Sequence, residues 1–247
     1  MYMYDMTIAG LRIRFQLQDS HTRLYLIKNG RIRGADVSSE ESEQCHIIVP
    51  PVDLDRLKEE KERLGGDKAF AEYSLLIEPL SNLLLRNKHF LFHSAAFLWH
   101  KKAFLFTAQS GVGKSTQLRN WLDLYQDEIE VINGDKPIIE RQKKEFIVHP
   151  SPWTGKEGLG GIKSAPLGGI IYLEQGLDDK ILRISPKEAA YPVFLQFLYK
   201  PTDVDSLNYV CSYEESLLSC VPVWKLTNTG TLQSAQLTHQ TLIEEGF

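Results

Sequence analysis

The chain has 247 residues, 43% of them hydrophobic, and a formal net charge of −4. This length allows one large domain, or a domain with a smaller appended piece, and enough apolar residues to bury a sizeable core. A negative net charge provides no electrostatic basis for binding nucleic acid, which usually requires a basic surplus, so no nucleic-acid partner is expected.

The cysteines and the apolar runs indicate in which cellular compartment the protein is expected. Cys45, Cys211 and Cys220 are an odd number without paired spacing, which argues against a disulfide framework or a zinc site and favours a reducing cytoplasm. The N-terminus lacks the basic start and apolar core of a signal peptide. No apolar run is long enough to span a bilayer. We therefore expect a cytoplasmic protein with no membrane partner.

The first residues of the chain predict short strands. Alternating apolar and polar residues from Ile8 to Leu17 predict a strand, and "RLYLIKNG" predicts another that ends in the turn Asn29–Gly30. Residues 38–44, "SSEESEQ", predict a polar loop. The segment "CHIIVPPVD" predicts a strand halted by its two prolines.

Two helical patterns follow. The charged residues 53–68, closed by Gly65–Gly66, predict a solvated helix or loop. Residues 69–88 predict one amphipathic helix that packs on the core. Its apolar positions at helical spacing are Phe70, Tyr73, Leu76, Ile77, Leu80 and Leu84. Residues 1–84 are thus expected to form a β-rich N-terminal portion that ends in an amphipathic helix.

From about residue 85 the pattern becomes α/β. Helical spacing over 114–125 and in the tail after residue 230 predicts two helices, and residues 186–200 fit either helix or loop. The strand-like runs are residues 90–100, 101–108, 128–134, 143–153, 167–175, 180–185 and 221–230.

One strand–turn–helix in this half has the features of a P-loop. The strand is Ala103–Thr107, the turn is Ala108–Gly113, and Lys114 and Ser115 open the helix. In such a loop, backbone N–H groups and the helix N-terminus bind phosphate oxygens. Ala108 stands where the motif has its first glycine, which suits alanine only if its φ is negative. The alternative is a chance match in an ordinary strand–turn–helix.

We expect the nucleotide phosphates to contact this loop and a lysine on the later glycine-rich segment "HPSPWTGKEGLGG". That segment would cover the terminal phosphate and exclude water. The alternative is an irregular surface loop. The expected nucleotide-binding residues are Ser110, Gly111, Val112, Gly113, Lys114, Ser115, Thr116 and Lys156.

Residues 92–135 resemble the catalytic domain of HPr kinase/phosphorylase, a bacterial protein-serine kinase related to PEP carboxykinases. "FLFHSAAFLWHKKAFLFTAQSGVGKS" places His93 on the strand before the P-loop strand, and "SGVGKS" matches the family's P-loop. "VINGDKPII" lies where the family has a hydrophobic strand that ends in two aspartates. This chain keeps the second, Asp135, and has Gly134 in place of the first. The resemblance covers about residues 85–175.

The resemblance implies an α/β fold over residues 85–247: a P-loop kinase domain of the HPr kinase/PEP carboxykinase type with a mixed β-sheet. It also implies ATP and Mg²⁺ as cofactors. Phosphoryl transfer requires charge neutralisation, metal positioning and an oriented nucleophile. The expected catalytic residues are Lys114, Asp135 and His93, and the expected metal ligands are Ser115, Asp135 and Glu157.

Several of these residues could instead have a purely structural role. Asp135 closes an Asn-Gly-Asp sequence, which is also good turn chemistry. His93 has as its alternative a hydrogen-bonded histidine inside a strand. The remaining histidines considered lack partners at metal-ligand spacing and are expected to be structural: His89, His100, His149 and His239.

The function expected from these residues is ATP-dependent transfer of the γ-phosphoryl group to a hydroxyl acceptor, a Ser of a protein or peptide. The alternatives are a metabolite kinase and a non-catalytic nucleotide-binding switch. PEP carboxykinase chemistry is a further alternative, but the chain is short for it and shows no manganese-ligating set. The expected partners are a nucleotide and the hydroxyl acceptor, and assembly as a homo-oligomer is left open.

Overall fold

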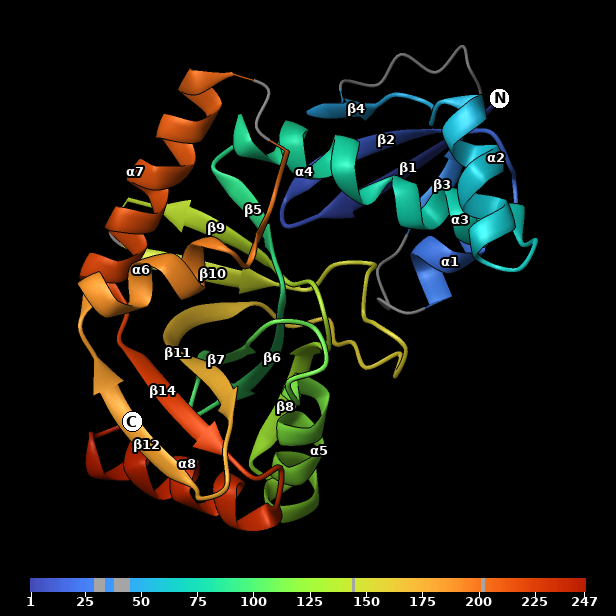
Figure 1. Cartoon of the computed structure of the whole chain (residues 1–247). Helices are drawn as coiled ribbons and strands as arrows, with labels where there is room; N and C mark the ends of the chain where they lie inside the picture. The colour runs from blue at the N-terminus through green and yellow to red at the C-terminus, as the bar shows by residue number, and fades with distance from the viewer. Residues whose placement is uncertain (29–33, 38–44, 144, 201–202) are drawn as a thin grey trace.

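The computed structural model describes residues 1–28, 34–37, 45–143, 145–200 and 203–247. Within them the chain builds two sheets, one of four strands near the N-terminus and one of ten strands that occupies the rest (Figure 1). The larger sheet contains both parallel and antiparallel neighbours. The expected mixed α/β architecture with a large mixed sheet is therefore confirmed.

The four-stranded sheet begins with a hairpin where a single strand was expected. Strands β1 (Tyr2–Ile8) and β2 (Leu11–Leu17) pair antiparallel through the turn Ala9–Gly10. Both turn residues have positive φ, 51° and 74°, which matches the turns that fit the twist of a two-residue hairpin. β3 (Gly34–Val37) and β4 (Ile47–Val49) flank the hairpin in the order β3-β1-β2-β4.

The strand expected over "RLYLIKNG" is wrong, because this segment forms helix α1 (Thr22–Lys28). Four consecutive apolar residues fit a strand or a helix equally, and packing against the helix over residues 68–75 selects the helix. Thr22 and Leu26, four residues apart, are both fully buried, as one helix face requires. The expected turn at Asn29–Gly30 and the loop over 38–44 lie outside the described residues.

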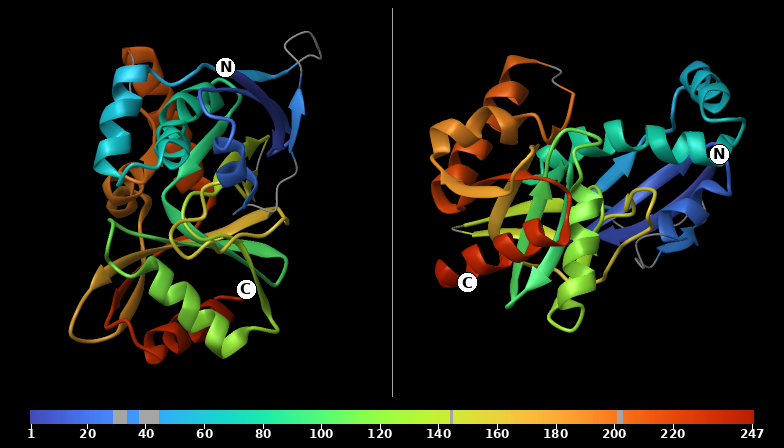
Figure 2. Two further views of the ribbon diagram at one scale, coloured as in Figure 1. Left: turned by 90° about the vertical axis from the view of Figure 1, so that its right-hand side faces the viewer. Right: turned by 60° about the horizontal axis from the view of Figure 1, so that its bottom comes forward.

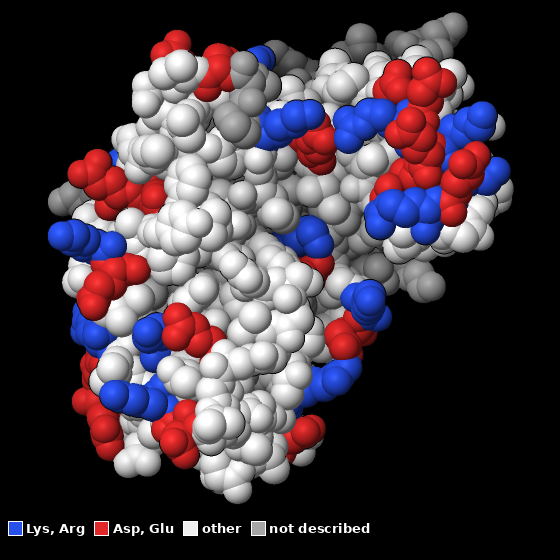
Figure 3. All heavy atoms as spheres, viewed as in Figure 1, with Lys and Arg blue, Asp and Glu red and all other residues white. Residues whose placement is uncertain are grey.

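The charged segment forms helix α2 (Leu54–Arg63), the first of the two expected options. The Asp53 carboxylate caps it by accepting hydrogen bonds from the backbone of Asp55 and Arg56 at 3.1 and 3.0 Å. Leu57 is buried, whereas acidic and basic side chains gather densely over this helix (Figure 3). α2 is thus a solvated helix whose single buried side chain, Leu57, joins the apolar cluster of the N-terminal portion.

Residues 69–88 form two helices where one was expected, α3 (Lys68–Leu75) and α4 (Ile77–Leu85). Pro79 accounts for the interruption, because proline has no N–H to bond the carbonyl of Leu75 and its ring clashes with that carbonyl. In the first turn of a new helix the missing N–H is harmless, so α4 restarts just before the proline.

The ten-stranded sheet runs in the order β13-β5-β9-β10-β11-β7-β6-β8, with β14 beside β11 and β12 beside β14. β9 was not expected from the sequence, and the run expected over 90–100 divides into two strands at His93. The strands are β5 (His89–Phe92), β6 (Ser94–Trp99), β7 (Lys102–Thr107), β8 (Ile129–Asn133), β9 (Ile138–Gln142), β10 (Glu145–His149), β11 (Ala165–Gln175), β12 (Lys180–Ile184), β13 (Phe197–Leu198) and β14 (Val223–Asn228).

Two pairs of helices pack on this sheet. α5 (Lys114–Tyr125) and α8 (Leu232–Glu244) lie side by side, as both views of Figure 2 show. They share a buried cluster with the central strand β7, which includes Phe106, Trp121 and Ala235. Residues of the second pair, α6 (Pro186–Phe194) and α7 (Val204–Cys220), belong to a separate cluster. Within the described residues no helix combines the length and apolar character needed to cross a bilayer.

Helix α7 was not expected from the sequence, although its 17 residues make it long. Its buried stripe runs through Val210, Tyr213 and Leu217, at helical spacing. Asp203 starts the helix by accepting a hydrogen bond from the backbone of Ser206 at 2.7 Å. Cys211, Ser212 and Ser216, which lie between the stripe positions, are weak helix formers, so packing rather than propensity determines this helix.

Glu214 in α7 makes stability depend on pH. It is 7% exposed, and burial raises its pKa to about 7. A raised folded-state pKa contributes stability below the unfolded value of 4.5, and this is lost as pH rises through about 7. We expect Glu214→Gln to raise the free energy of unfolding by about 3 kcal/mol at pH 8 and to change it little near pH 4. Urea denaturation at both pH values measures this, and an equal effect at both would contradict it.

Candidate active site

The glycine-rich loop connects the carboxyl end of β7 to the start of α5. Gly111 and Gly113 have φ of 85° and 115°, a region that favours glycine. Ala108 is not among the non-glycine residues with positive φ and is fully buried, so alanine meets the condition set for this position. Gly113 is the N-cap residue of α5. Because it has no side chain, it provides no capping oxygen to the backbone N–H groups in the first turn of α5.

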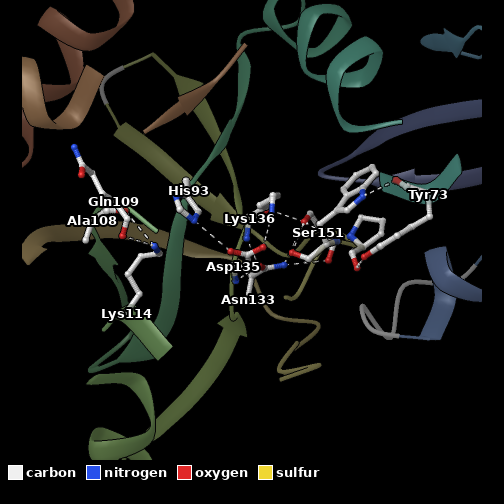
Figure 4. Close-up of polar contacts among 11 residues, drawn as sticks. Tyr73, His93, Ala108, Gln109, Lys114, Asn133, Asp135, Lys136 and Ser151 are labelled. Carbon is white, nitrogen blue, oxygen red and sulfur yellow. Dashed lines mark hydrogen bonds and ion pairs between the residues drawn. The ribbon is translucent and has the colours of Figure 1, made fainter. Parts of the chain in front are cut away.

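Lys114 turns back over the loop. Its Nζ donates hydrogen bonds to the carbonyl oxygens of Ala108 and Gln109 at 3.1 and 3.4 Å (Figure 4). The residue is 7% exposed, and burial lowers the pKa of Lys114, opposed by the carboxylate of Asp135. A buried ammonium group at the start of a helix is a strong site for phosphate.

Asp135 follows β8 in a turn built by Asn133. The Asn133 side-chain oxygen accepts hydrogen bonds from the backbone N–H groups of Asp135 and Lys136 at 2.9 and 2.7 Å. The turn chemistry expected from Asn-Gly-Asp is therefore present, but it is Asn133 that supplies it. The Asp135 carboxylate is left to interact with other side chains.

His93 and Lys136 contact the two oxygens of this carboxylate. His93 Nε2 lies 3.5 Å from Asp135 Oδ1, and Lys136 Nζ pairs with Oδ2 (Figure 4). Burial alone would raise the pKa of Asp135, but the hydrogen bond from His93 and the charge of Lys136 outweigh it and lower the pKa. Asp135 is therefore a carboxylate at neutral pH.

His93 lies in the break between β5 and β6, not on a strand as expected. Its N–H donates to the carbonyl of Gln196 at 2.8 Å, and its carbonyl accepts from the hydroxyl of Thr107 at 2.8 Å. These bonds replace strand pairing and hold the backbone so that the ring reaches Asp135. Thr107 is the last residue of β7, so the same bond ties His93 to the start of the glycine loop.

The loop, His93 and Asp135 line one cavity of about 480 Å³. Of the residues expected to act here, Val112 alone is absent from the lining, because its side chain packs on the core below α5. Gly134, Lys136, Thr154 and Gly155 were not among the expected site residues. The lining residues are His93, Ser110, Gly111, Gly113, Lys114, Ser115, Thr116, Gly134, Asp135, Lys136, Thr154, Gly155, Lys156 and Glu157. Lys136 could have been predicted as a site residue, because it directly follows Asp135 in the sequence.

The segment expected to cover the terminal phosphate does border this cavity. Lys156 is exposed at its rim, and Glu157 forms an ion pair with Arg119 of α5. A Cβ built on Gly155 would lie 3.0 Å from Cβ of Asp135, so the segment touches the turn after β8. The Glu157 carboxylate is therefore at the cavity but already has a cationic partner.

A chain of hydrogen bonds fixes this segment to the N-terminal portion (Figure 4). The Asn133 side-chain amide donates to the carbonyl of Ser151 at 3.0 Å, and the Ser151 hydroxyl accepts from the backbone of Trp153 at 3.2 Å. The Trp153 indole donates to the carbonyl of Tyr73 in α3 at 3.1 Å, and the Tyr73 hydroxyl donates to the carbonyl of Pro152 at 3.0 Å. The turn that carries Asp135 is thus braced from α3.

Gly134, in place of the resembled family's first aspartate, is explained by crowding. A Cβ on Gly134 would lie 2.9 Å from the carbonyl oxygen of Thr154 and 3.0 Å from that of Leu159. The backbone N–H of Gly134 also donates to the Leu159 carbonyl at 2.8 Å. The glycine-rich segment therefore occupies the space that a side chain at this position would require.

This crowding predicts that Gly134→Ala lowers the free energy of unfolding by about 1–3 kcal/mol, because two backbone carbonyls must move to admit the methyl group. The φ of Gly134 is not positive, so the loss would come from space and not from backbone strain. Chemical denaturation of the variant beside the wild type measures it. An unchanged denaturation midpoint would contradict this prediction and show that the glycine-rich segment can move to admit the methyl group at no cost in stability.

The cavity offers oxygen ligands of the kind that Mg²⁺ prefers. The Ser115 hydroxyl and the carboxylates of Asp135 and Glu157 all line it. The donor set therefore fits a hard divalent cation.

Comparisons with known proteins add little. No protein-family model matches the chain, and no curated protein matches it. Among solved structures, the chain is similar to the Hpr(Ser) kinase/phosphatase from Coxiella burnetii, with 11% identity and a TM-score of 0.34 over 63% of this chain and 99% of that one. At this TM-score the likeness carries no argument about activity or site residues.

Proposed function

We propose that the protein is an ATP-dependent kinase that transfers the γ-phosphoryl group to a hydroxyl acceptor, a Ser of a protein or peptide. One observation carries the proposal: a single cavity brings together a glycine loop with its buried Lys114 and the His93–Asp135 pair. The glycine loop and Lys114 would bind a polyphosphate, and the His93–Asp135 pair would activate an alcohol. We also propose that residues 85–247 form the P-loop kinase unit and residues 1–84 a smaller unit.

The loop would hold the nucleotide. N–H groups around Gly111 and Gly113 and at the start of α5 would donate to phosphate oxygens, and Lys114 would exchange its loop carbonyls for the β- and γ-phosphates. Ser115 and Asp135 would hold Mg²⁺, with Glu157 as a third candidate ligand. When bound, Mg²⁺ neutralises charge that develops on the phosphate oxygens.

Asp135 would take the proton of the acceptor hydroxyl. The acceptor oxygen forms a bond to the γ-phosphorus as the bond from that phosphorus to the β–γ bridging oxygen breaks, so ADP leaves. His93, 3.5 Å from Oδ1, would orient the carboxylate and stabilise its charge. Lys156 at the cavity rim would approach the terminal phosphate and help to exclude water.

The test uses γ-labelled ATP, Mg²⁺ and the full chain with an array of Ser-containing peptides. We expect label on a subset of peptides, and loss of that label when their Ser is replaced by Ala. Label transferred to small molecules of a cell extract but to no peptide would make the protein a metabolite kinase. Absence of ATP binding in calorimetry with Mg²⁺ present would reject the proposal altogether.

A non-catalytic nucleotide-binding switch is the second candidate, and the ion pair of Lys136 with Asp135 favours it. A paired carboxylate with a lowered pKa is a weaker base than a free one. Lys136→Ala separates the two functions. A kinase would keep its dependence on Asp135 in this background, whereas a switch would show nucleotide binding and no transfer with or without Lys136.

A further inference from the structure

Three potential metal ligands lie on one face of three adjacent strands, away from the nucleotide cavity. His89 of β5 is directly opposite Glu140 of β9. Glu140 is in turn opposite Ile147 of β10, and His149 follows two residues later on the same strand. Because side chains two residues apart in a strand share a face, the register places all three side chains together.

Their ligand atoms converge. Nε2 of His149 lies 3.0 Å from Oε2 of Glu140, and Nε2 of His89 lies 4.0 Å from the same oxygen. All three ligand atoms lie within 4.8 Å of one another. The side chains of His89 and His149 are 5% and 11% exposed, and that of Glu140 is 22% exposed. Two imidazoles and a carboxylate are thus held together in a site that is largely shielded from solvent.

The outer nitrogens of both histidines have partners of their own. Nδ1 of His89 is 2.5 Å from the carbonyl oxygen of Asn87, and Nδ1 of His149 is 2.8 Å from the hydroxyl of Ser164. Metal-binding histidines typically donate their second ring N–H to such an oxygen, which fixes the ring and presents the other nitrogen to the ion. Both rings here are arranged in that way, with Nε2 facing Glu140.

We propose that His89, Glu140 and His149 bind a divalent cation of the zinc class. Donors about 2.0–2.1 Å from a tetrahedral zinc ion lie roughly 3.3 Å from one another. The separations of the two histidine nitrogens from Glu140, 3.0 and 4.0 Å, lie on either side of this value, and all ligand atoms lie within 4.8 Å of one another, so side-chain shifts would complete the geometry. Two imidazoles with one carboxylate are a common zinc ligand set, and imidazole favours Zn²⁺ over Mg²⁺.

The N-terminal portion offers a fourth donor. The carbonyl oxygen of Ala9, in the β1–β2 turn, lies 3.2 Å from Nε2 of His89. On the same sheet face, Leu91 and Ile138 belong to the apolar cluster that includes Ile8 and Ile13 of the hairpin. The cation would therefore fasten the N-terminal hairpin to β5, β9 and β10, and its role would be structural.

From the sequence alone, His89 and His149 are expected to be structural, because neither has a partner at metal-ligand spacing. The spacing rule failed because the ligands are distant along the chain and meet only through strand register. A metal-free alternative exists: His89 and His149 flank Glu140 as an ion-paired cluster. The experiment must separate that cluster from a cation site.

Zinc binding to the full chain provides this test, after treatment with a chelator and in excess Mg²⁺. We expect one equivalent of Zn²⁺ bound at micromolar affinity or tighter, with a rise in melting temperature. Glu140→Gln should weaken zinc binding by at least about 100-fold, and Ser164→Ala, which removes only the outer partner of His149, by about 10-fold. His21→Gln is the matched control, because His21 is 75% exposed and does not belong to the cluster.

Two further results decide the assignment. Asp135→Asn should leave the tight zinc site intact, which separates it from the nucleotide cavity. Co²⁺ in place of zinc should give visible absorption bands of nitrogen and oxygen ligation that disappear in Glu140→Gln. No zinc binding by the wild type in the micromolar range, or equal affinity in wild type, Glu140→Gln and Ser164→Ala, would overturn the proposal and leave a metal-free ion-paired cluster.

Discussion

Replacing Asp135 by asparagine is expected to lower the rate of phosphoryl transfer by roughly 10²–10⁴-fold, the range that general-base catalysis contributes. Asparagine keeps the size of the side chain but cannot accept a proton, and it loses the ion pairs with His93 and Lys136. Nucleotide binding through the glycine loop should persist. Single-turnover transfer from labelled ATP, with calorimetry on the same preparation, separates rate from binding.

The matched control for this prediction is Asp123→Asn, the same chemical change at an exposed position of α5. It should leave both rate and binding unchanged. If Asp135→Asn transfers phosphate as fast as the wild type, Asp135 is not the base and the kinase mechanism proposed above is wrong. Equal loss in both variants would indicate a nonspecific effect on the fold.

Replacing Lys114 by methionine is expected to weaken ATP binding by about 30-fold to several thousand-fold, equivalent to roughly 2–5 kcal/mol for one partner of a buried charge pair. Methionine fills a similar volume, so the buried position remains packed, but nothing neutralises the phosphates. The two loop carbonyls now bonded by Lys114 lose their donor. Calorimetry with Mg²⁺ and ATP measures the change.

Lys180→Met, at an exposed position of β12, is the control for charge in general. It removes the same charge from the chain, so any effect of net charge on nucleotide affinity appears in both variants. Affinity unchanged in Lys114→Met, in a chain shown by circular dichroism to be folded, would contradict the proposed phosphate site.

Contacts from α3 connect the N-terminal portion to the glycine-rich segment that borders the cavity. The Trp153 indole donates to the carbonyl of Tyr73, the Tyr73 hydroxyl donates to the carbonyl of Pro152, and the rings of Tyr73 and Trp153 stack with centroids 5.7 Å apart. Trp153 is 2% exposed and belongs to the apolar cluster of the N-terminal portion. Lys156 and Glu157 follow Trp153 by three and four residues, so their position at the cavity depends on contacts with α3.

Local features were predictable from the sequence because each depends on neighbours in the chain. The strand, glycine loop and helix over residues 103–125 occur as expected, since turn glycines, an apolar run and helical spacing are contiguous signals. The strand that Pro50 and Pro51 were expected to end, and the final helix, also occur. α1 and α7 were missed, because mixed apolar runs fit two structures and packing chooses between them.

By itself, the sequence determined that a glycine loop and a lysine open a helix in an α/β chain. Only the tertiary structure decided that His93, from the break between β5 and β6, would meet Asp135, from the end of β8. Strand register likewise brought His89, Glu140 and His149 to one face. The physical reason is that local backbone preferences act over a few residues, whereas strand order and core packing decide which distant side chains become neighbours.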